Sequence, residues 1–469
     1  MHNQITNDIE NSISVDDSQD PPSITDGLKE EDRPVNWPST KKWYIVVSTS
    51  LATFVVSFGS SVYSAAIPHI QTHFSVSSET ALLGITLYVI GFALGPMAWG
   101  PASELYGKRR PLFLGYAIFC ICQLPCALAQ NISLLLTFRF LSGLAGSSGL
   151  AILGGMYVDF LARPAERGIS TAVFSVATFC GPTVGPIVGN LATLKLGWRW
   201  TAWLTLIGGV VFGSVAFLLT PETSEVVILR QRSKGNTLVT PSRIYRPERD
   251  ISTFVQSYLT KPVRMFLIFF TIYMSLAYGI IYLTFTMYPL AFVTVRGWSR
   301  MDGSLPFIGM TVGVVLACIG IALHSIYYIQ QSRVHVPERR LPPMIAGSIL
   351  LSAGIFWFGW TSSTSVHWLA QASAGVFLGS GSILVLMSGV VYLIEVYLVH
   401  ANSALAINNF LRCVIAATFP LYATDLLVDV GLGVGGTVIG SICLVLSPFS
   451  FLFWRYGRTI RQWSKFAEE

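Results

Sequence analysis

The chain is dominated by apolar runs, each of which is long enough to cross a lipid bilayer. A bilayer core takes about 20 mainly apolar residues per helix, and twelve such runs can be placed in the sequence. Their approximate limits are 43–67, 80–101, 111–129, 134–158, 168–192, 200–220, 263–289, 305–328, 342–361, 366–393, 403–425 and 432–456. Because lipid offers backbone groups no hydrogen-bond partner, runs of this length cross as helices. The sequence therefore predicts an all-α polytopic membrane protein that interacts with a lipid bilayer.

The charged residues agree with this fold class. Only 12% of the residues are charged and 52% are hydrophobic, whereas soluble domains carry about 25% charged residues. The net charge of +6 is divided among separate short loops, so it predicts no basic groove and no nucleic-acid partner.

The positions of the basic residues predict the orientation in the membrane. Most of the 30 Lys and Arg lie in the two tails and in every second loop, where positive charge is retained on the cytoplasmic side. The other loops hold only Lys195, Arg199, Arg296 and Arg300. We therefore expect both termini to be cytoplasmic.

Two polar stretches interrupt the apolar pattern. Residues 1–40 are acidic, with few large apolar side chains, and this composition predicts a disordered cytoplasmic tail. Residues 221–262 form a predicted cytoplasmic linker between six runs in 41–220 and six in 263–456. Residues 457–469 are expected to form a second cytoplasmic tail.

The turn between the second and third runs combines an acid, a glycine and a basic cluster. Glu104 and Gly107 precede Lys108, Arg109 and Arg110. This order resembles the signature turn between the second and third helices of the major facilitator superfamily. The resemblance implies that Glu104, Gly107 and Arg109 act in gating or coupling. Glu104 is expected to pair with a cation or to cap a helix amino end, and a solvated loop charge is the alternative.

The fourth run contains Arg139, which begins the segment Arg139–Gly146. A charge at the centre of a membrane helix costs about 2.5 to 3.5 kcal/mol on insertion scales, so this side chain should face protein, water or a counter-charge. Hydrogen bonds to neighbouring carbonyls would give Arg139 a structural role. A coupling or gating role is the alternative, because the segment resembles the superfamily's fourth-helix motif.

Small residues recur every four positions in the fifth run, and proline follows two of them. The series is Ala177, Gly181, Gly185 and Gly189, with Pro182 and Pro186. Small residues at this spacing let two membrane helices approach closely, and proline permits bending. The segment 181–186 resembles the fifth-helix motif of the superfamily's antiporters, which implies a coupling role for Gly181, Pro182, Gly185 and Pro186.

The resemblance extends from about Asn36 to Ala467 and narrows to the fungal twelve-spanner drug:proton antiporter branch. Its landmarks include Trp198–Trp200, Pro221–Thr223, Tyr288–Pro289 and Phe419–Pro420. The family implies twelve helices in two pseudo-symmetric six-helix bundles, which expose a central site alternately to each side. It also implies a monomer in the plasma membrane, a small-molecule substrate and protons as the coupling ion.

The acidic residues restrict the substrate and the proton path. No Asp or Glu lies near the middle of a predicted span, and Thr286 stands where many relatives carry a glutamate before the equivalent of Pro289. A membrane-embedded carboxylate is the simplest proton carrier and the simplest counter-ion for a cation. We therefore expect a neutral or anionic amphipathic substrate. Asp159 and Arg167 are expected to join the gating network around Glu104, and proton coupling is inferred from the family.

Hydroxyls, aromatic rings and two polar groups lie on the helices expected to line the central cavity. The predicted substrate-binding residues are Ser61, Tyr63, Ser147, Tyr278, Tyr282, Phe285, Asn408 and Arg412. An apolar and aromatic lining of this kind suits hydrophobic ligands, and Arg412 is expected to attract an anion. Core packing is the alternative for any single aromatic residue.

Other functions find little support in the sequence. It contains no metalloprotease, nucleophile-elbow or phosphate-loop motif, so no enzyme activity and no cofactor are predicted. The glycines between 431 and 436 are read as helix-packing residues. The seven cysteines lie in apolar runs without His or acidic neighbours, which predicts neither a metal site nor disulfides. Asn131 begins a glycosylation sequon in a short loop.

Three alternatives to a proton-coupled exporter remain open. They are a proton-independent facilitator, an uptake symporter and a non-transporting membrane sensor. We expect export of a xenobiotic or of a secondary metabolite.

Overall fold

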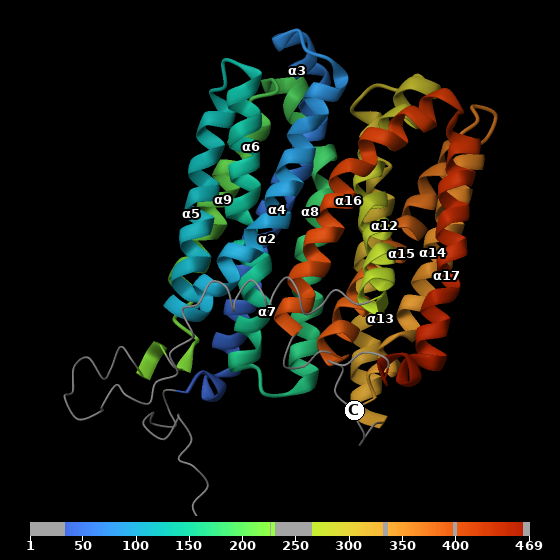
Figure 1. The fold of residues 1–469 in the computed structure, drawn as a ribbon. Helices are drawn as coiled ribbons and strands as arrows, with labels where there is room; N and C mark the ends of the chain where they lie inside the picture. Colours follow the sequence, from blue (N-terminus) through green and yellow to red (C-terminus); the bar gives the residue numbers. More distant parts are fainter. Residues whose placement is uncertain (1–32, 226, 230–264, 332–335, 397–400, 463–469) are drawn as a thin grey trace, which may run out of the picture.

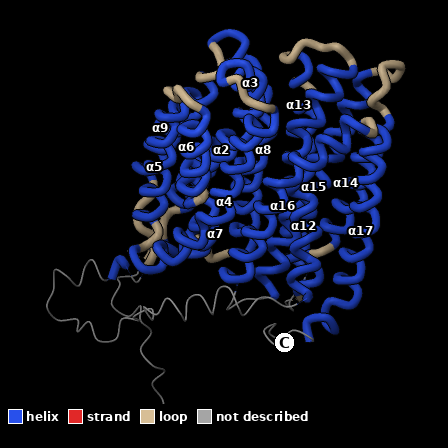
Figure 2. The backbone as a smooth tube through the Cα atoms, turned by 45° about the horizontal axis from the view of Figure 1, so that its top comes forward, coloured by secondary structure: helices blue, strands red, loops and turns tan. Residues whose placement is uncertain are grey.

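The computed structural model describes residues 33–225, 227–229, 265–331, 336–396 and 401–462, and these ranges are helical with no strand (Figure 2). Eleven helical segments within them are long and apolar enough to cross a membrane. The remaining predicted span, the eleventh in chain order, is the helix α16 (Ala401–Asp429). Within this helix, Ile407–Phe419 is an apolar stretch. Most of both predicted tails and of the linker lies outside the described residues.

The predicted six-and-six arrangement is confirmed, and the two bundles stand side by side (Figure 1). The short turn η2 (Pro34–Asn36) precedes the first bundle. The first bundle contains α2 (Ser39–Ser61) with η3 (Val62–Ala66) and α3 (Ile67–Phe74), α4 (Ser78–Tyr106), α5 (Arg109–Ala127), α6 (Ile132–Gly146) with α7 (Ser148–Phe160), α8 (Pro164–Leu196) and α9 (Trp200–Leu219).

The second bundle is interrupted at other places than the first. It contains α12 (Met265–Tyr288) with η6 (Pro289–Val295), η7 (Asp302–Ser304), α13 (Phe307–Gln331), η8 (Pro337–Arg340), α14 (Pro342–Trp360), α15 (Trp368–Val396), α16 and α17 (Leu432–Gln462). The bundles contact each other where α8 packs on α13 and where α4 packs on α16.

Two spans are longer and less regular than the apolar runs predicted. The first α-helix ends at Ser61, and the chain continues through a 3-10 turn into α3. The seventh span continues past Tyr288 as a π-helical turn that begins at Pro289. Proline lacks the N–H that an α-helix would use there, so the hydrogen-bond register changes.

Close helix packing follows the glycine series in the fifth run. A Cβ atom added at Gly181 would lie 2.7 Å from Phe58 N, and one added at Gly189 would lie 2.8 Å from Val62 O. A Cβ at Gly185 would overlap Ser61 Oγ. The small side chains of α8 therefore let its backbone rest on α2, while Pro182 and Pro186 remain inside a continuous helix.

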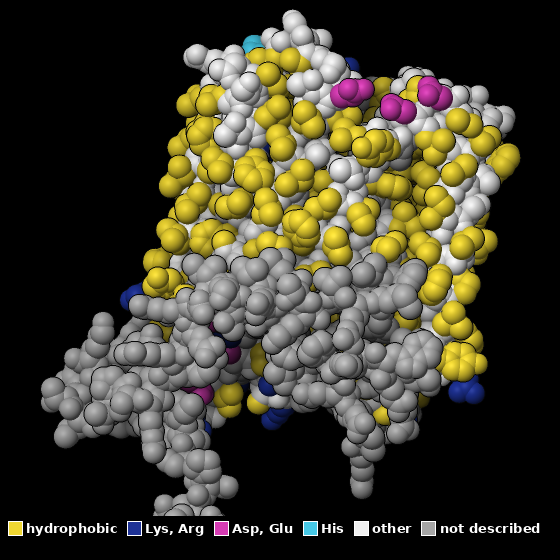
Figure 3. Space-filling view, viewed as in Figure 1, with side chains coloured by type: hydrophobic (Ala, Val, Ile, Leu, Met, Phe, Trp, Pro, Cys, Tyr) yellow, Lys and Arg dark blue, Asp and Glu magenta, His cyan; other side chains and the backbone are white. Residues whose placement is uncertain are grey.

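The two ends of the molecule carry different loops. We call the end at the bottom of Figure 1 the lower end, which contains residues 107–108, 161–163, 221–225 and 336–341. The upper end contains residues 75–77, 128–131, 197–199 and 361–367. A broad hydrophobic band separates the two ends, and the visible charged side chains lie at its margins (Figure 3). This band matches the bilayer-crossing surface that the apolar runs predict.

Candidate functional site

Arg139 is buried inside the first bundle, with 4% of its surface exposed. Its guanidinium donates three hydrogen bonds to backbone carbonyls. Nη1 reaches Gly59 O at 2.7 Å, Nη2 reaches Ser60 O at 3.2 Å, and Nε reaches Gly84 O at 3.1 Å. In the described part of the chain, no acidic side chain forms an ion pair with it.

The break in the first span explains why Arg139 is needed. The last carbonyls of a helix have no N–H partner in the next turn, and α2 ends at Ser61 within the membrane. A cation at a helix carboxyl end is also favoured by the helix dipole. The rings of Tyr63 and Tyr88 lie 4.6 and 4.4 Å from the guanidinium carbon and enclose it. Arg139 therefore caps the broken end of α2.

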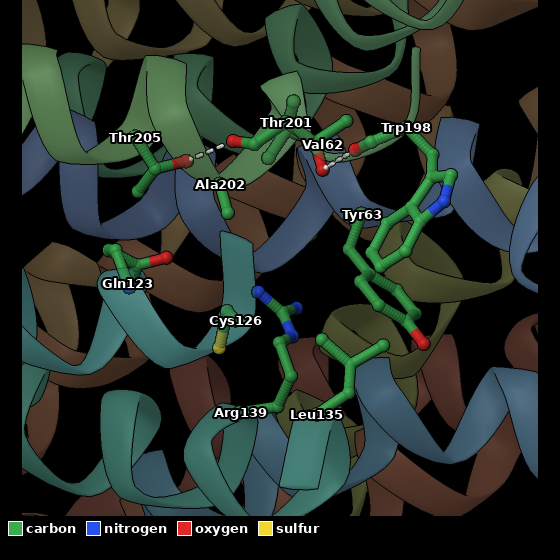
Figure 4. A pocket seen from close by; sticks show the side chains of 10 residues that line it. All are labelled: Val62, Tyr63, Gln123, Cys126, Leu135, Arg139, Trp198, Thr201, Ala202 and Thr205. Carbon is green, nitrogen blue, oxygen red and sulfur yellow. Dashed lines mark hydrogen bonds between the residues drawn. The ribbon is translucent and has the colours of Figure 1, made fainter. Parts of the chain in front are cut away.

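The space around this arginine is too small for a substrate. The guanidinium points into a cavity lined by Gln123, Cys126 and Trp198 among others (Figure 4). Its volume of about 10 Å³ holds one water molecule at most. Arg139 therefore makes the hydrogen bonds to neighbouring carbonyls that a structural role predicts, and the cavity beside it leaves no room for a substrate.

A second set of side chains lies where the two bundles meet. We call it the interface cluster, and its members are Ser60, Phe179, Tyr278, Tyr282, Asn409 and Arg412. The rings of Tyr278 and Tyr282 pack edge to face at 5.2 Å. Tyr282 Oη donates to Ser60 Oγ at 3.5 Å, and Phe179 packs on Tyr278 at 6.4 Å. The second bundle thus contacts α2 and α8 of the first through α12.

Arg412 is the charged member of the interface cluster. Its guanidinium carbon lies 5.0 Å from the centre of the Tyr278 ring, and Nη2 donates to Asn409 Oδ1 at 2.8 Å. Asn409 in turn donates to Phe92 O of the first bundle at 3.2 Å. The Nε and Nη1 atoms of Arg412 are buried and have no hydrogen-bond partner. Buried donors without acceptors are costly, so an acceptor placed here would be stabilising.

The predicted substrate-binding residues divide between this cluster and other places. Phe285 extends the cluster, because its ring packs on Tyr282 at 5.4 Å. Four others bond inside their own bundle: Ser61 to Gly181 O, Tyr63 to Ala81 O, Ser147 to Leu144 O and Asn408 to Thr271 Oγ1. The structure therefore brings Tyr278, Tyr282, Phe285 and Arg412 together and places those four elsewhere.

The predicted gating residues at the lower end form part of a second network. Lys108 Nζ lies 2.6 and 2.7 Å from the two carboxylate oxygens of Asp159. Thr223 donates to the same carboxylate at 2.9 Å. This ion pair joins the turn before α5 to the end of α7 and to the chain after α9.

Glu222 was not predicted as part of this network, although it occupies the amino end of α5. Its carboxylate accepts hydrogen bonds from Lys108 N at 2.9 Å and Arg109 N at 3.2 Å. Gly107 has a positive φ of 88°, and a Cβ there would lie 2.6 Å from Glu222 Oε2. The sequence signal that would have identified Glu222 is an acid in one lower-end loop and three consecutive cations, residues 108–110, in another. Glu104 was expected to cap a helix amino end, but Glu222 accepts the hydrogen bonds of these two amides at the start of α5.

The other lower-end residues lie outside this ion pair. Glu104 is exposed. Arg167 donates from Nε to Leu161 O at 2.6 Å and so bonds the loop beside it. The second bundle has a matching ion pair, in which Arg340 Nε lies 2.8 Å from Glu395 Oε1. In the first bundle, the end of the fourth span thus pairs with the turn before the third. In the second bundle, the end of the tenth span pairs with the turn before the ninth.

The family model described as Major Facilitator Superfamily matches residues 49–420. The chain belongs to this family. It is therefore a multi-pass membrane transporter in which the interface cluster lies between the two halves of a major facilitator fold.

Similar proteins are fungal transporters. The "Citrinin biosynthesis cluster MFS transporter mrr1" of Monascus ruber is 42% identical, over 98% of this chain and 96% of the relative. The "MFS-type transporter traF" of Penicillium crustosum is 40% identical, over 94% and 92%. The "Efflux pump FUB11" of Gibberella moniliformis is 36% identical, over 92% and 75%.

The fold also resembles a solved structure. The human organic anion transporter MFSD10 superposes with a TM-score of 0.59 and covers 88% of this chain and all of its own. With 16% sequence identity, this likeness concerns the fold alone. No group of three or more His, Cys, Asp or Glu in the described ranges is placed to hold a metal ion.

Proposed function

We propose that this transporter exports small amphipathic organic compounds that carry a negative charge, such as a fungal secondary metabolite or a toxic xenobiotic. Arg412 is the observation that carries the proposal. It supplies two buried nitrogen donors without acceptors at the junction of the two bundles. A guanidinium matches a carboxylate or enolate in charge and in hydrogen-bond geometry.

The neighbours of Arg412 suit the rest of such a molecule. Tyr278, Tyr282 and Phe179 offer ring surfaces to an apolar or aromatic body, and ligand sites are commonly apolar with a few placed polar groups. These side chains come from both bundles, so a rocking motion of one bundle against the other would change their spacing. A bound ligand would thereby be exposed to alternate sides.

The names of the relatives support export of a secondary metabolite. Two are named for citrinin biosynthesis clusters and one is named an efflux pump. The Gly-Pro pairs at 181–182 and 185–186 of α8 favour antiport over symport, by resemblance to the family's antiporters. We infer that the lower end faces the cytosol, because Lys108, Arg109 and Arg340 lie there. A plasma-membrane location is inferred from the resemblance to the exporter branch alone.

Proton antiport would use an acid at a helix end. The described spans hold no carboxylate beside the interface cluster, whereas Asp159 lies at the lower end of α7 in contact with Lys108. Protonation of Asp159 would break this ion pair and loosen the contact between the turn before α5 and α7. Asp159 is therefore our candidate carrier, with Glu104 as the second candidate.

Proton movement in sealed liposomes tests this function. The purified protein would be given an imposed pH gradient and matched anionic, neutral and cationic amphiphiles. We expect proton flux that depends on the anionic compound and is lost in Asp159→Asn. Transport of the anion without proton flux would instead show a facilitator, and transport of cations alone would contradict the proposed substrate class.

A further inference from the structure

A groove runs along the outer surface of the first bundle between α5 and α9, which lie side by side at the left of Figure 1. Its volume is about 1030 Å³. Leu114, Ile121, Val210 and Leu218 line it, and each is between 52% and 79% exposed. In a membrane these apolar side chains face lipid, so the groove opens to the bilayer and not to the interface cluster.

Small residues give the groove its depth. Ala117 of α5 and Gly213 and Ser214 of α9 are part of its lining. A Cβ atom at Gly213 would overlap the ring of Tyr116, so α9 approaches α5 closely at this level. Larger apolar side chains of both helices, among them Phe113 and Phe217, complete the lining. The result is a channel between two helices whose lining suits an extended hydrocarbon chain.

Positive charge is concentrated at the lower end of the groove. Arg109 and Arg110 both line it. Arg109 donates from Nη2 to Phe217 O at 3.2 Å and lies 4.8 Å from the Phe217 ring, while its Nε is buried without a hydrogen-bond partner. Arg110 is exposed. The two guanidinium groups therefore lie where a lipid headgroup meets the helix ends.

One carboxylate also lines this end, and its hydrogen bonds are directed toward the backbone. Glu222 accepts from the amides of Lys108 and Arg109, and from those of Thr223 and Ser224 at 3.1 Å each. The acceptor atoms are thus engaged by the amino end of α5 and by the following turn. The arginine side chains keep donors for a further anion.

We propose that this groove binds one anionic phospholipid. The phosphate and the acidic headgroup contact Arg109 and Arg110, and one acyl chain lies over Ala117 and Gly213. Basic pockets between membrane helices at the headgroup level recognise acidic lipids in this way. This lipid site lies apart from the interface cluster, and lipid binding there depends neither on the substrate nor on the direction of transport.

Lipid retention by the purified full chain tests the proposal. Native mass spectrometry would count bound phosphatidylserine and, separately, phosphatidylcholine with the same acyl chains, while thermal unfolding is followed in parallel. Two variants alter the two parts of the site: Arg110→Gln removes a headgroup contact, and Ala117→Trp fills the floor. Arg163→Gln is the matched control, because Arg163 is 82% exposed at the same end and outside the groove.

We expect wild type and Arg163→Gln to retain one phosphatidylserine in preference to phosphatidylcholine. Arg110→Gln should weaken this binding about fivefold, the usual effect of one basic residue near a charged lipid surface, and Ala117→Trp should abolish it. Glycerophosphoserine, which has no acyl chains, should give no thermal shift. Equal retention of both lipids, or unchanged phosphatidylserine binding in both groove variants, would overturn the proposal.

Discussion

Two arginines lie inside membrane spans of this transporter, and their surroundings differ. Arg139 donates to three carbonyls and lies between two tyrosine rings. Arg412 makes one side-chain hydrogen bond and leaves two buried nitrogens without acceptors. The same residue type thus caps a helix in one bundle and offers donors at the junction of both bundles. The completeness of the hydrogen bonding, more than burial, separates a structural charge from a candidate binding group.

The two arginines are also linked through one short path. Arg139 bonds Ser60 O, Ser60 Oγ accepts from Tyr282, and the hydroxyls of Tyr282 and Tyr278 lie 3.4 Å apart. Arg412 lies over the Tyr278 ring. A disturbance of the cap on α2 should therefore reach the interface cluster, although Arg139 does not contact it directly.

Removal of Arg139 should have the largest effect. Arg139→Ala leaves the carbonyls of Gly59 and Ser60 without their donor in a buried site, at a cost of roughly 3 kcal/mol. We expect membrane insertion to persist, the unfolding temperature to fall and transport to be lost. The measurements are the amount of protein in the membrane, thermal unfolding in detergent and transport in liposomes. Wild-type transport rates in this variant would show that transport does not need Arg139.

Packing on the other side of the same α2 segment should come next. A leucine at Gly181 would collide with the backbone of α2, since its Cβ alone lies 2.7 Å from Phe58 N. Overpacking of this kind costs about 1 to 3 kcal/mol. Thermal unfolding of Gly181→Leu should show that loss, whereas Gly154→Ala, where a Cβ meets nothing within 4 Å, should be neutral or slightly more stable. Equal behaviour of the two variants would contradict close packing of α8 on α2.

The ion pair at the lower end should have a smaller effect. Lys108 and Asp159 are 21% and 23% exposed, so the loss of their attraction in Lys108→Met should cost about 1 kcal/mol. Arg163→Met serves as the control, because its distance to Glu166 is long, at 3.8 Å, and the Arg163 side chain is 82% exposed. Thermal unfolding compares the two, and an equal change in both would show that the short distance and partial burial of the Lys108–Asp159 pair add nothing to stability.

Removal of Arg412 should have the smallest effect on stability. Arg412→Met deletes two donors that have no acceptor and one bond to Asn409, so the unfolding free energy should stay within about 0.5 kcal/mol of wild type or rise. The comparison with Arg139→Met, measured in the same detergent, sharpens the contrast between the two arginines. A large loss of stability in Arg412→Met would show that its role is structural as well.

The sequence predicted the spans better than it predicted the site. Apolar runs and glycine spacing depend on side chains, so the helices and the close packing of α8 on another helix could be anticipated, although not that the partner is α2. The cap on α2 could not, because Arg139 binds carbonyls of Gly59 and Ser60, and a free carbonyl leaves no mark in a sequence. The 3-10 turn after Ser61 creates those free acceptors, and hydropathy does not report it.

Side-chain direction accounts for the remaining differences. Ser61 lies one position after Ser60 on the same helix, yet Ser61 faces α8 while Ser60 meets Tyr282. A rotation of about 100° per residue decides which of the two reaches the cluster. Arg412 was expected to attract an anion, but the state of its Nε and Nη1 atoms depends on packing between two bundles that are distant in sequence.

The most direct test of the account compares one anionic amphiphile with its neutral methyl ester. Both would be transported by wild type and by Arg412→Gln in liposomes, with protein amount and unfolding temperature matched. The account predicts that Arg412→Gln lowers transport of the carboxylate by a factor of about ten or more, the usual worth of a charge-assisted hydrogen bond, and leaves the ester unchanged. Equal loss for the two compounds, or no loss for the carboxylate, would contradict it.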